Sequence, residues 1–312
     1  MRIFLAGATG AVGRRLVPAL IRAGHTVVAT TRASDKIEML QTMGAEPVVL
    51  DALDRDTTAS AVAAARPDAI IHQATALPQS PDLRKFAEAF AQTNRLRTDG
   101  LDNLLAAARA AGVRRIVAQS FTGWPNIREG GPVKTEEDPL DPAPAPQFRT
   151  TLAAIRYLED KLTTTPGIDG FALRCGAFYG PGSGFATDGA IWRAVRARRF
   201  PVVGSGDGVW SFIHLDDVAA ATIAALERGA PGIYNIVDDE PAPVRAWLPD
   251  YALAIGAKSP MRIPAFLARL FIGAAGVAMM TDIRGSSNAK AKRDLGWTPR
   301  FASWREGFRA GL

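Results

Sequence analysis

Three glycines near the N-terminus recur at a spacing of three residues, in the turn Gly7-Ala8-Thr9-Gly10-Ala11-Val12-Gly13. The turn follows a short apolar run and opens a helical pattern. One glycine permits a tight turn, another lets backbone N–H groups approach a pyrophosphate, and another lets helix and strand pack closely, while the helix dipole favours an anion. The pattern predicts a nicotinamide dinucleotide site, and a packing turn without a ligand is the alternative.

The residue after the second apolar run indicates which dinucleotide is bound. An NAD site normally places Asp or Glu there for the ribose 2′-hydroxyl, whereas Arg suits the 2′-phosphate of NADP. Here Thr31 is followed by Arg32, and Arg14 is also close to the turn in sequence. The sequence therefore favours NADP, and NAD stays an alternative. Asp51, at the end of the third run, could accept a hydrogen bond from the adenine amino group or cap its own backbone.

A tyrosine and a lysine four residues apart, Tyr157 and Lys161, share one face of a predicted helix. A nearby cation stabilises a phenolate, lowers the tyrosine pKa and makes it a usable acid or base. Ser120 ends the fifth apolar run, where its hydroxyl could stabilise a developing oxyanion, with Thr122 as a competing candidate. The alternatives are an exposed helix pair and a serine that caps its own strand.

The sequence gives little support for a serine hydrolase or for a metal site. His214, Asp216 and Asp217 suggest a triad with Ser120, but the Gly-x-Ser-x-Gly elbow of serine hydrolases is missing, so structural roles are expected. Three histidines and one cysteine argue against a zinc site and exclude a disulfide framework. No metal is expected.

Composition limits the class of protein. The 312 residues are 47% hydrophobic and 22% charged, with a formal net charge of +6, as in a globular protein with a large core. We interpret the positive charge as scattered surface arginine rather than a nucleic-acid site. The apolar stretch from Ile263 to Met280 contains a proline, an arginine and glycines and is a poor membrane span. No leader precedes the first strand, so a cytoplasmic protein is expected.

Short apolar runs alternate with helical patterns over the first half of the chain. The expected strands are 3–5, 26–30, 47–50, 69–72, 115–119 and 171–174, and the expected helices are 12–23, 35–43, 57–65, 83–111 and 150–163. This alternation predicts an α/β fold of the Rossmann type, with a doubly wound parallel sheet. The expected division is a dinucleotide-binding domain over 1–175, with parts of 209–237 returning to it, and a smaller, interleaved C-terminal α/β substrate lobe over 176–312.

The stretch from Trp124 to Gln147 contains six prolines and a Gly-Gly pair, which exclude a helix or a central strand. Since it follows the fifth strand, it should lie at the carboxyl edge of the sheet, where ligands bind. We interpret it as a flap on the substrate side.

Several motifs resemble those of the extended short-chain dehydrogenase/reductases of the NAD-dependent epimerase/dehydratase type. Besides the glycine turn, they are Asn94 with Leu101–Leu105, Ser120 with Tyr157 and Lys161, Leu173–Gly182, Phe212–Ala219 and Asp294–Pro299. The resemblance implies a Rossmann enzyme in which the tyrosine exchanges the proton, the lysine binds the nicotinamide ribose and the serine positions the substrate oxygen. It also implies a homodimer through the fourth and fifth helices.

The expected catalytic residues are Ser120, Tyr157 and Lys161. The expected cofactor-binding residues are Gly7, Thr9, Gly10, Ala11, Val12, Gly13, Arg32, Asp51, Ala52, Ala74, Asn94, Tyr157 and Lys161. The leading hypothesis is an NADP(H)-dependent oxidoreductase that acts on a carbonyl or secondary alcohol of a small, fairly apolar substrate. The alternatives are a nucleotide-sugar epimerase or dehydratase, with Arg193–Arg199 serving a diphosphate, and a non-catalytic NADP-binding redox sensor.

Overall fold

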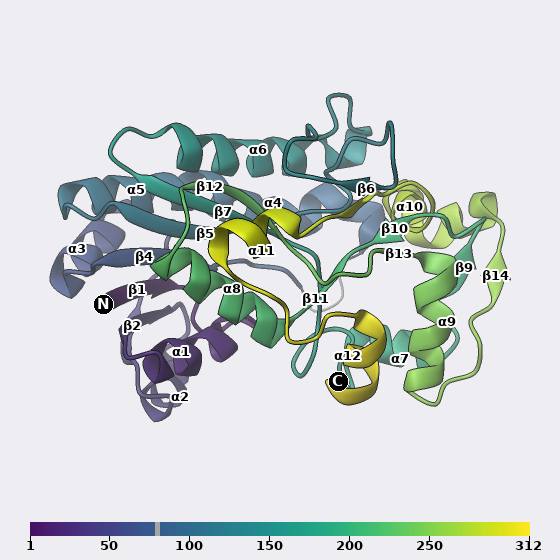
Figure 1. The fold of residues 1–312 in the computed structure, drawn as a ribbon, viewed down its shortest axis with the longest axis horizontal. Coiled ribbons are helices and arrows are strands. Elements are labelled where there is room, and N and C mark those ends of the chain that lie inside the picture. Colours follow the sequence, from purple (N-terminus) through teal and green to yellow (C-terminus); the bar gives the residue numbers. More distant parts are fainter. Residues whose placement is uncertain (79–81) are drawn as a thin grey trace.

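A seven-stranded parallel sheet forms the centre of the molecule in a computed structural model that describes residues 1–78 and 82–312 (Figure 1). The strand order is β12-β7-β5-β4-β1-β2-β3. The strands are β1 (Arg2–Ala6), β2 (Thr26–Thr31), β3 (Glu46–Val49), β4 (Ala69–His72), β5 (Arg115–Phe121), β7 (Asp169–Cys175) and β12 (Gly232–Ile236). The order reverses beside β1, which is where such sheets bind ligands at the carboxyl ends of their strands.

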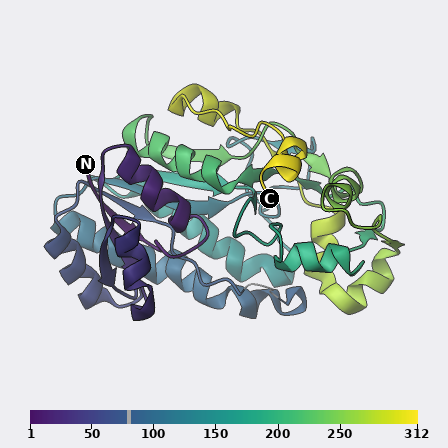
Figure 2. The ribbon, with the colours of Figure 1, turned by 90° about the horizontal axis from the view of Figure 1, so that it is seen from below.

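Helices cover both faces of the sheet, which confirms the predicted doubly wound α/β fold (Figure 1, Figure 2). One face carries α1 (Gly13–Arg22), α2 (Ile37–Thr42), α8 (Leu215–Glu227) and α11 (Ala289–Leu295). The other face carries α3 (Arg55–Ala65), α5 (Leu101–Ala110) and α6 (Arg149–Thr164). Side chains alternate along each strand, so Ile3 and Leu5 pack in one core and Phe4 and Ala6 in the other.

The helical pattern predicted over 83–111 is a chain of four segments rather than one helix. They are the 3₁₀ turn Leu83–Lys85, α4 (Phe86–Arg95), a π-helical turn over Leu96–Gly100, and α5. A π turn holds an extra residue, so it rotates the side chains before it relative to those after it. The buried residues of this turn include Leu96 and Arg97.

The smaller lobe lies beyond the carboxyl edge of the sheet, at the right of Figure 1. Its strands are β8 (Ala177–Tyr179), β9 (Val202–Val203), β10 (Val209–Trp210), β11 (Phe212–His214), β13 (Ala242–Pro243) and β14 (Arg262–Ile263). Its helices are α7 (Ala190–Arg196), α9 (Val244–Ala254), α10 (Ala265–Thr281) and α12 (Trp304–Ala310). Strands β10 and β11 are separated by Ser211 alone and pair with different partners, β13 and β8. An aromatic core around Phe185, Phe212 and Trp247 holds the lobe together.

Helix α10 bends at Gly273, whose φ of 68° lies outside the helical region. The apolar stretch predicted to be a poor membrane span is thus two short helical segments. Among the residues that the structure describes, none of the helices combines the length and the apolar character that crossing a bilayer requires.

The proline-rich loop is packed rather than extended into solvent. Its short strand β6 (Val133–Lys134) pairs with β15 (Gly285–Ser286), and a bridge joins Asn126 to Leu140. The loop ends in the 3₁₀ turn Pro146–Phe148 that leads into α6. Trp124 stacks on Phe148, with 4.9 Å between the ring centroids. The loop therefore closes the carboxyl edge of the sheet beside β5.

Candidate active site

The glycine turn lies at the mouth of a pocket between the carboxyl ends of β1, β2, β3 and β4. The predicted residues that line it are Gly7, Thr9, Gly10, Arg32, Asp51, Ala52 and Ala74. A Cβ on Gly7 would lie 2.5 Å from the Ala74 nitrogen, whereas one on Gly10 would meet only the Gly7 oxygen at 3.5 Å. Gly7 thus permits a close approach of two strand ends, and Gly10 leaves space on the ligand side.

Other predicted cofactor residues support this pocket without lining it. A Cβ on Gly13 would clash with the Gly7 oxygen, so Gly13 permits close packing of α1 against the turn. Val12 is buried in the core beneath α1, and Ala11 packs against that core. Asn94 does not line the pocket: its Nδ2 donates to Thr151 Oγ1 at 3.0 Å, which holds α4 against α6.

The pocket fits a dinucleotide. The side-chain amide of Gln73 lines it, and both the oxygen and the nitrogen of that amide are buried without a hydrogen-bond partner among the described residues. Buried amide groups are costly unless they are satisfied, so a polar ligand is expected there. Arg32 is exposed at the same pocket. Asp51 is its single acidic lining residue in the described part of the chain, and one of its oxygens already accepts a hydrogen bond from the Leu53 N–H at 3.0 Å.

A second pocket lies beside the first and is mainly aromatic and apolar. Its lining residues are Leu77, Phe90, Arg97, Gln119, Phe121, Thr122, Gly123, Trp124, Gly176, Ala177, Phe178, Trp210, Ser211, Met279 and Ile283. The π-helical turn joins the two pockets, because Leu96 lines the dinucleotide pocket and Arg97 lines the apolar one. This apolar pocket is the candidate substrate site.

Ser120 does not point into this pocket, contrary to our expectation. The strand continues to Phe121, so Gln119 and Phe121 face the apolar pocket and Ser120 faces the opposite way, toward α6. Ser120 is fully buried, and its Oγ donates to Glu159 Oε1 at 2.7 Å. Its position in the structure is that of a core hydroxyl.

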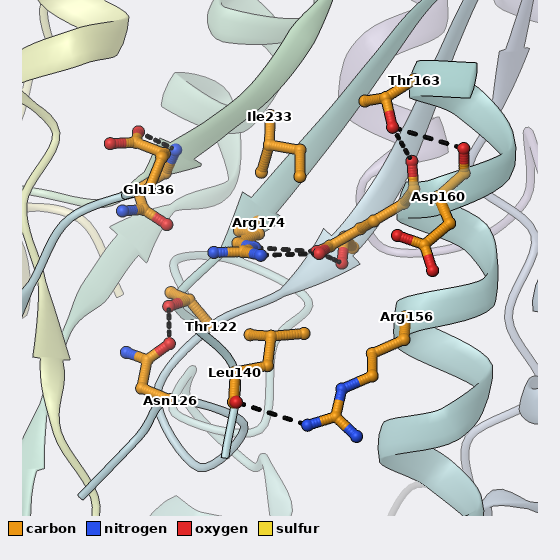
Figure 3. Close-up of polar contacts among 12 residues, drawn as sticks. Thr122, Asn126, Glu136, Leu140, Arg156, Asp160, Thr163, Arg174 and Ile233 are labelled. Atoms are coloured by element: carbon orange, nitrogen blue, oxygen red, sulfur yellow. Dashed lines mark hydrogen bonds and ion pairs between the residues drawn. The ribbon is translucent and has the colours of Figure 1, made fainter. Parts of the chain in front are cut away.

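The same glutamate forms a buried ion pair with Arg174 of β7. Arg174 Nε and Nη2 donate to the two Glu159 oxygens at 2.8 and 2.6 Å, as the dashed lines from Arg174 show in Figure 3. Both side chains are almost fully buried. The three groups join α6, β5 and β7, so Ser120 contributes to a structural cluster under the sheet.

Tyr157 and Lys161 also lie outside the two pockets, beside Asp102 of α5. The Tyr157 hydroxyl donates to Asp102 Oδ2 of α5 at 2.5 Å, and Lys161 Nζ lies 3.9 Å from Asp102 Oδ1. Neither residue lines the dinucleotide pocket or the apolar pocket. The hydrogen bond to Asp102 raises the pKa of Tyr157 to about 12, the opposite of the lowered pKa that we expected. The structure therefore does not bring Ser120, Tyr157 and Lys161 together.

Helix geometry explains why Tyr157 and Lys161 point away from both pockets. Glu159 faces the sheet, and a residue two positions away on a helix points about 200° around the axis. Tyr157 and Lys161 therefore point outward. The i, i+4 pair at the start of the helix that does face inward is Phe148 and Leu152, which pack with Trp124 in an apolar cluster. The inward-facing positions at the start of this helix are therefore apolar.

Arg97 is the functional candidate that the sequence reasoning missed. Buried positions in the π turn and α5 fall at 96, 97, 100, 101, 104 and 105, so Arg97 lies on the buried side of an amphipathic pattern. An arginine at a buried position of this pattern could have been recognised from the sequence as a candidate functional residue. The residue is only 5% exposed, and its Nη1 is buried with no hydrogen-bond partner among the described residues. Burial lowers its pKa to about 10, so it remains cationic at neutral pH.

The residues expected to have structural or alternative roles make local contacts. His214 Nδ1 accepts from the Asp216 N–H at 3.1 Å and caps α8, while Asp217 accepts from the N–H groups of Arg300 and Phe301. Arg196 donates to the Ile255 oxygen at 3.2 Å. The described residues form no cluster able to hold a metal ion.

The parallel sheet and the glycine turn define a Rossmann-type fold, the class to which nicotinamide-dependent oxidoreductases of this kind belong. The chain belongs to the NAD dependent epimerase/dehydratase family, whose model matches residues 3–237. It is an enzyme of the extended short-chain dehydrogenase/reductase type, as the sequence predicted.

Curated relatives are named reductases. The chain is 44% identical over 308 residues to a 3-diazoavenalumate denitrifying reductase of a Streptomyces species, covering 98% of this chain and 99% of the relative. It is 27% identical to a 2-alkyl-3-oxoalkanoate reductase of Stenotrophomonas maltophilia strain K279a, covering 99% of this chain and 98% of the relative.

Similar folds occur among solved structures. A UDP-glucose 4-epimerase of Thermus thermophilus in complex with NAD has a TM-score of 0.75 at 25% identity, covering 100% of this chain and 97% of the other. A human epimerase family protein with NADPH also has a TM-score of 0.75, at 19% identity, covering 99% and 98%. The second likeness, below 25% identity, shows the fold alone.

Proposed function

We propose that this enzyme uses NADP(H) to reduce an aromatic diazo group, with the apolar pocket as the substrate site. The observation that carries the proposal is that no side chain able to donate a proton at neutral pH is found among the described residues that line the apolar pocket. Among the described residues, Arg97 is the one titratable side chain that lines this pocket, and it remains cationic at neutral pH. A reaction that needs a proton from a side chain has no donor here.

The hydroxyl groups in the pocket are already engaged. Thr122 Oγ1 is hydrogen-bonded to Asn126 Oδ1, drawn in Figure 3, and to Ser286 Oγ. Ser211 Oγ accepts from the Ser286 N–H at 2.8 Å. Their role is to hold the ends of β5, β10 and β15 around the pocket. The aromatic walls from Phe121, Trp124 and Trp210 exclude water and suit a flat ring.

A diazo group fits this environment. A bound reduced nicotinamide supplies a hydride, and an aryl diazonium that takes up a hydride becomes the arene and releases dinitrogen without consuming a proton. The 44% identical relative is named for a diazo substrate and for loss of nitrogen, over nearly the full length of both chains. Glu159, Ser120 and Arg174 position β5 and β7 beneath this chemistry and do not enter it.

The test is turnover of an arenediazonium whose ring also carries a carboxylate, because the one charged side chain that lines the pocket among the described residues, Arg97, is a cation. We expect enzyme-dependent oxidation of NADPH with stoichiometric release of dinitrogen, measured by mass spectrometry after subtraction of the reaction without enzyme. Tight NADPH binding without dinitrogen release above that background would contradict the proposal. Simple aryl ketones serve as the comparison, because their reduction needs a proton.

Carbonyl reduction is the second candidate, since the 27% identical relative is named a reductase of 2-alkyl-3-oxoalkanoates. A water molecule would then have to supply the proton. Faster turnover of ketones than of diazonium salts would favour this candidate. Interconversion of UDP-sugars would favour the epimerase, and NADPH binding without any turnover would favour the redox sensor.

Arg32 supports NADP rather than NAD as the cofactor. It is exposed at the end of β2, and no acidic side chain at that strand end lines the dinucleotide pocket within the described residues. Replacement Arg32→Ala is expected to weaken NADPH about tenfold or more and NADH about twofold or less, because a charge-assisted contact to phosphate is worth roughly 1.5–3 kcal/mol. Fluorescence titration measures both. Arg22→Ala, on α1 and outside the pocket lining, is the control. Equal weakening of both cofactors would contradict the assignment.

A further inference from the structure

We propose that Arg97 binds an anionic oxygen of the substrate, so that the pocket selects planar aromatic anions, carboxylates or phenolates, over neutral rings. The inference rests on the proposed function for the location of the substrate. It adds the class of substrate and the residue that recognises it.

The guanidinium of Arg97 lacks a counter-charge in direct contact among the described residues. Glu159 attracts it through space, but both Glu159 oxygens are held by Arg174 and one also accepts from Ser120. Nη1 of Arg97 is buried without a hydrogen-bond partner among residues 1–78 and 82–312. Burying a charged donor without an acceptor is unfavourable. An incoming anion would satisfy it.

The surroundings of Arg97 define the rest of the ligand. Phe90, Phe121, Trp124, Phe178 and Trp210 line the same pocket, so an occupant is enclosed by ring faces and edges. Gln119 adds one polar side chain, and no carboxylate from the described residues lines the pocket to repel an anion. A flat ring with one negatively charged oxygen therefore matches both the walls and the cation.

The π-helical turn fixes the place of this anion relative to the cofactor. Leu96 lines the dinucleotide pocket and its carbonyl accepts from His72 Nε2 at 2.9 Å, while the next residue, Arg97, lines the apolar pocket. The anion would thus be held where the two pockets adjoin. A substrate anchored there has its ring oriented by a fixed charge rather than by apolar contact alone.

The decisive experiment measures binding without turnover. Cinnamate and cinnamamide have nearly the same shape, but only cinnamate is an anion, so this pair tests a carboxylate. 4-Nitrophenolate and 4-nitroanisole test a phenolate in the same way, because methylation removes the charge on the phenolic oxygen. Titration in the presence of NADP⁺, followed by isothermal calorimetry, should show at least one anion binding tenfold or more tightly than its neutral partner. Arg97→Gln should abolish this preference, leave the neutral ligands within threefold of wild type and leave NADPH affinity within threefold.

Arg114 is an exposed arginine just before β5 that pairs with Asp169, so Arg114→Gln is the matched control and should keep the preference. A preference for cinnamate would identify a carboxylate as the anionic group, and a preference for 4-nitrophenolate would identify a phenolate. Equal binding of anion and neutral partner by wild type, or a preference that survives Arg97→Gln, would overturn the proposal, as would a tenfold loss of NADPH affinity. If Arg97→Gln does not fold, Arg97→Leu takes its place, and an undiminished preference has the same meaning. An enzyme that binds these anions but releases no dinitrogen fails the proposed function and not this inference.

Discussion

Ser120 shows how strand alternation decides the role of a single hydroxyl. Its Oγ bonds to Glu159 in the interior, one residue away from two side chains that line the substrate pocket. Replacement Ser120→Ala removes a hydrogen bond to a buried carboxylate that Arg174 still neutralises. We expect the free energy of unfolding to fall by about 2 kcal/mol and kcat/KM to stay within threefold of wild type.

Urea denaturation measures the loss, and Ser60→Ala on the exposed side of α3 is the control, since its hydroxyl bonds only to its own helix. A hundredfold loss of kcat/KM at unchanged stability would restore a catalytic role for Ser120.

Tyr157 gives a second prediction at this scale. Its hydroxyl is bound to Asp102, its pKa is raised to about 12, and it lines neither pocket. Tyr157→Phe is therefore expected to leave kcat/KM within twofold of wild type across neutral pH. Tyr234→Phe, whose hydroxyl bonds to the Ala230 oxygen, is the control for loss of a structural hydroxyl. A large drop specific to Tyr157→Phe, with loss of the pH dependence of kcat, would show that proton transfer does pass through this residue.

At the scale of the element, the contact between β4 and the π turn depends on a neutral histidine. His72 is fully buried, and burial lowers its pKa from 6.5 to about 4. Because the folded pKa is depressed, the unfolded chain takes up the proton first as the pH falls. The stabilising contribution is complete above pH 6.5 and is lost as the pH falls toward 4. At 1.36 kcal/mol per pKa unit this single group accounts for up to about 3 kcal/mol.

His72→Gln tests this contribution, because glutamine can still donate to the Leu96 oxygen but does not titrate. Denaturation at a series of pH values should give a shallower fall in stability for the variant between these limits. Parallel curves for variant and wild type would show that other groups cause the acid sensitivity.

The elements also show where sequence reasoning succeeds and where it stops. The glycine turn and Arg32 could be found because their chemistry depends on residues adjacent in sequence and on a strand that precedes a helix. The inward face of α6 could not be found from the sequence. Tyr157 and Leu152 both lie on that helix, and only its packing against the sheet decides which of them faces inward. Arg97 was overlooked although its place in the buried phase of the apolar pattern was visible, because the π turn that brings it to the apolar pocket was not.

At the scale of the whole molecule, the dinucleotide pocket and the apolar pocket are built largely from different parts of the fold. The dinucleotide pocket uses the ends of β1 to β4, whereas the apolar pocket uses β5, the segment after β7, β10 and α10. The sheet was predictable from local patterns. The apolar pocket was not predictable, because Trp124, Trp210 and Met279 converge on it from segments far apart in sequence.

Association of two copies through the fourth and fifth helices stays a prediction. Tyr157 and Lys161 lie on the outer side of α6 beside Asp102 of α5, so they would be near such a contact. Sedimentation velocity at micromolar concentration should show a species of twice the 33.2 kDa chain mass. A single species at the chain mass would contradict it.

The π turn over Leu96–Gly100 has a consequence for how this enzyme could be re-engineered or could diverge. Deleting one residue, such as Thr98, would restore an ordinary α-helix and rotate α4 against α5 by about 100°. No side chain in either pocket would be substituted, yet Arg97 and Leu96 would no longer face their neighbouring pockets together. A change in chain length by one residue, rather than a change in residue type, could therefore switch the ligand preference of this pocket.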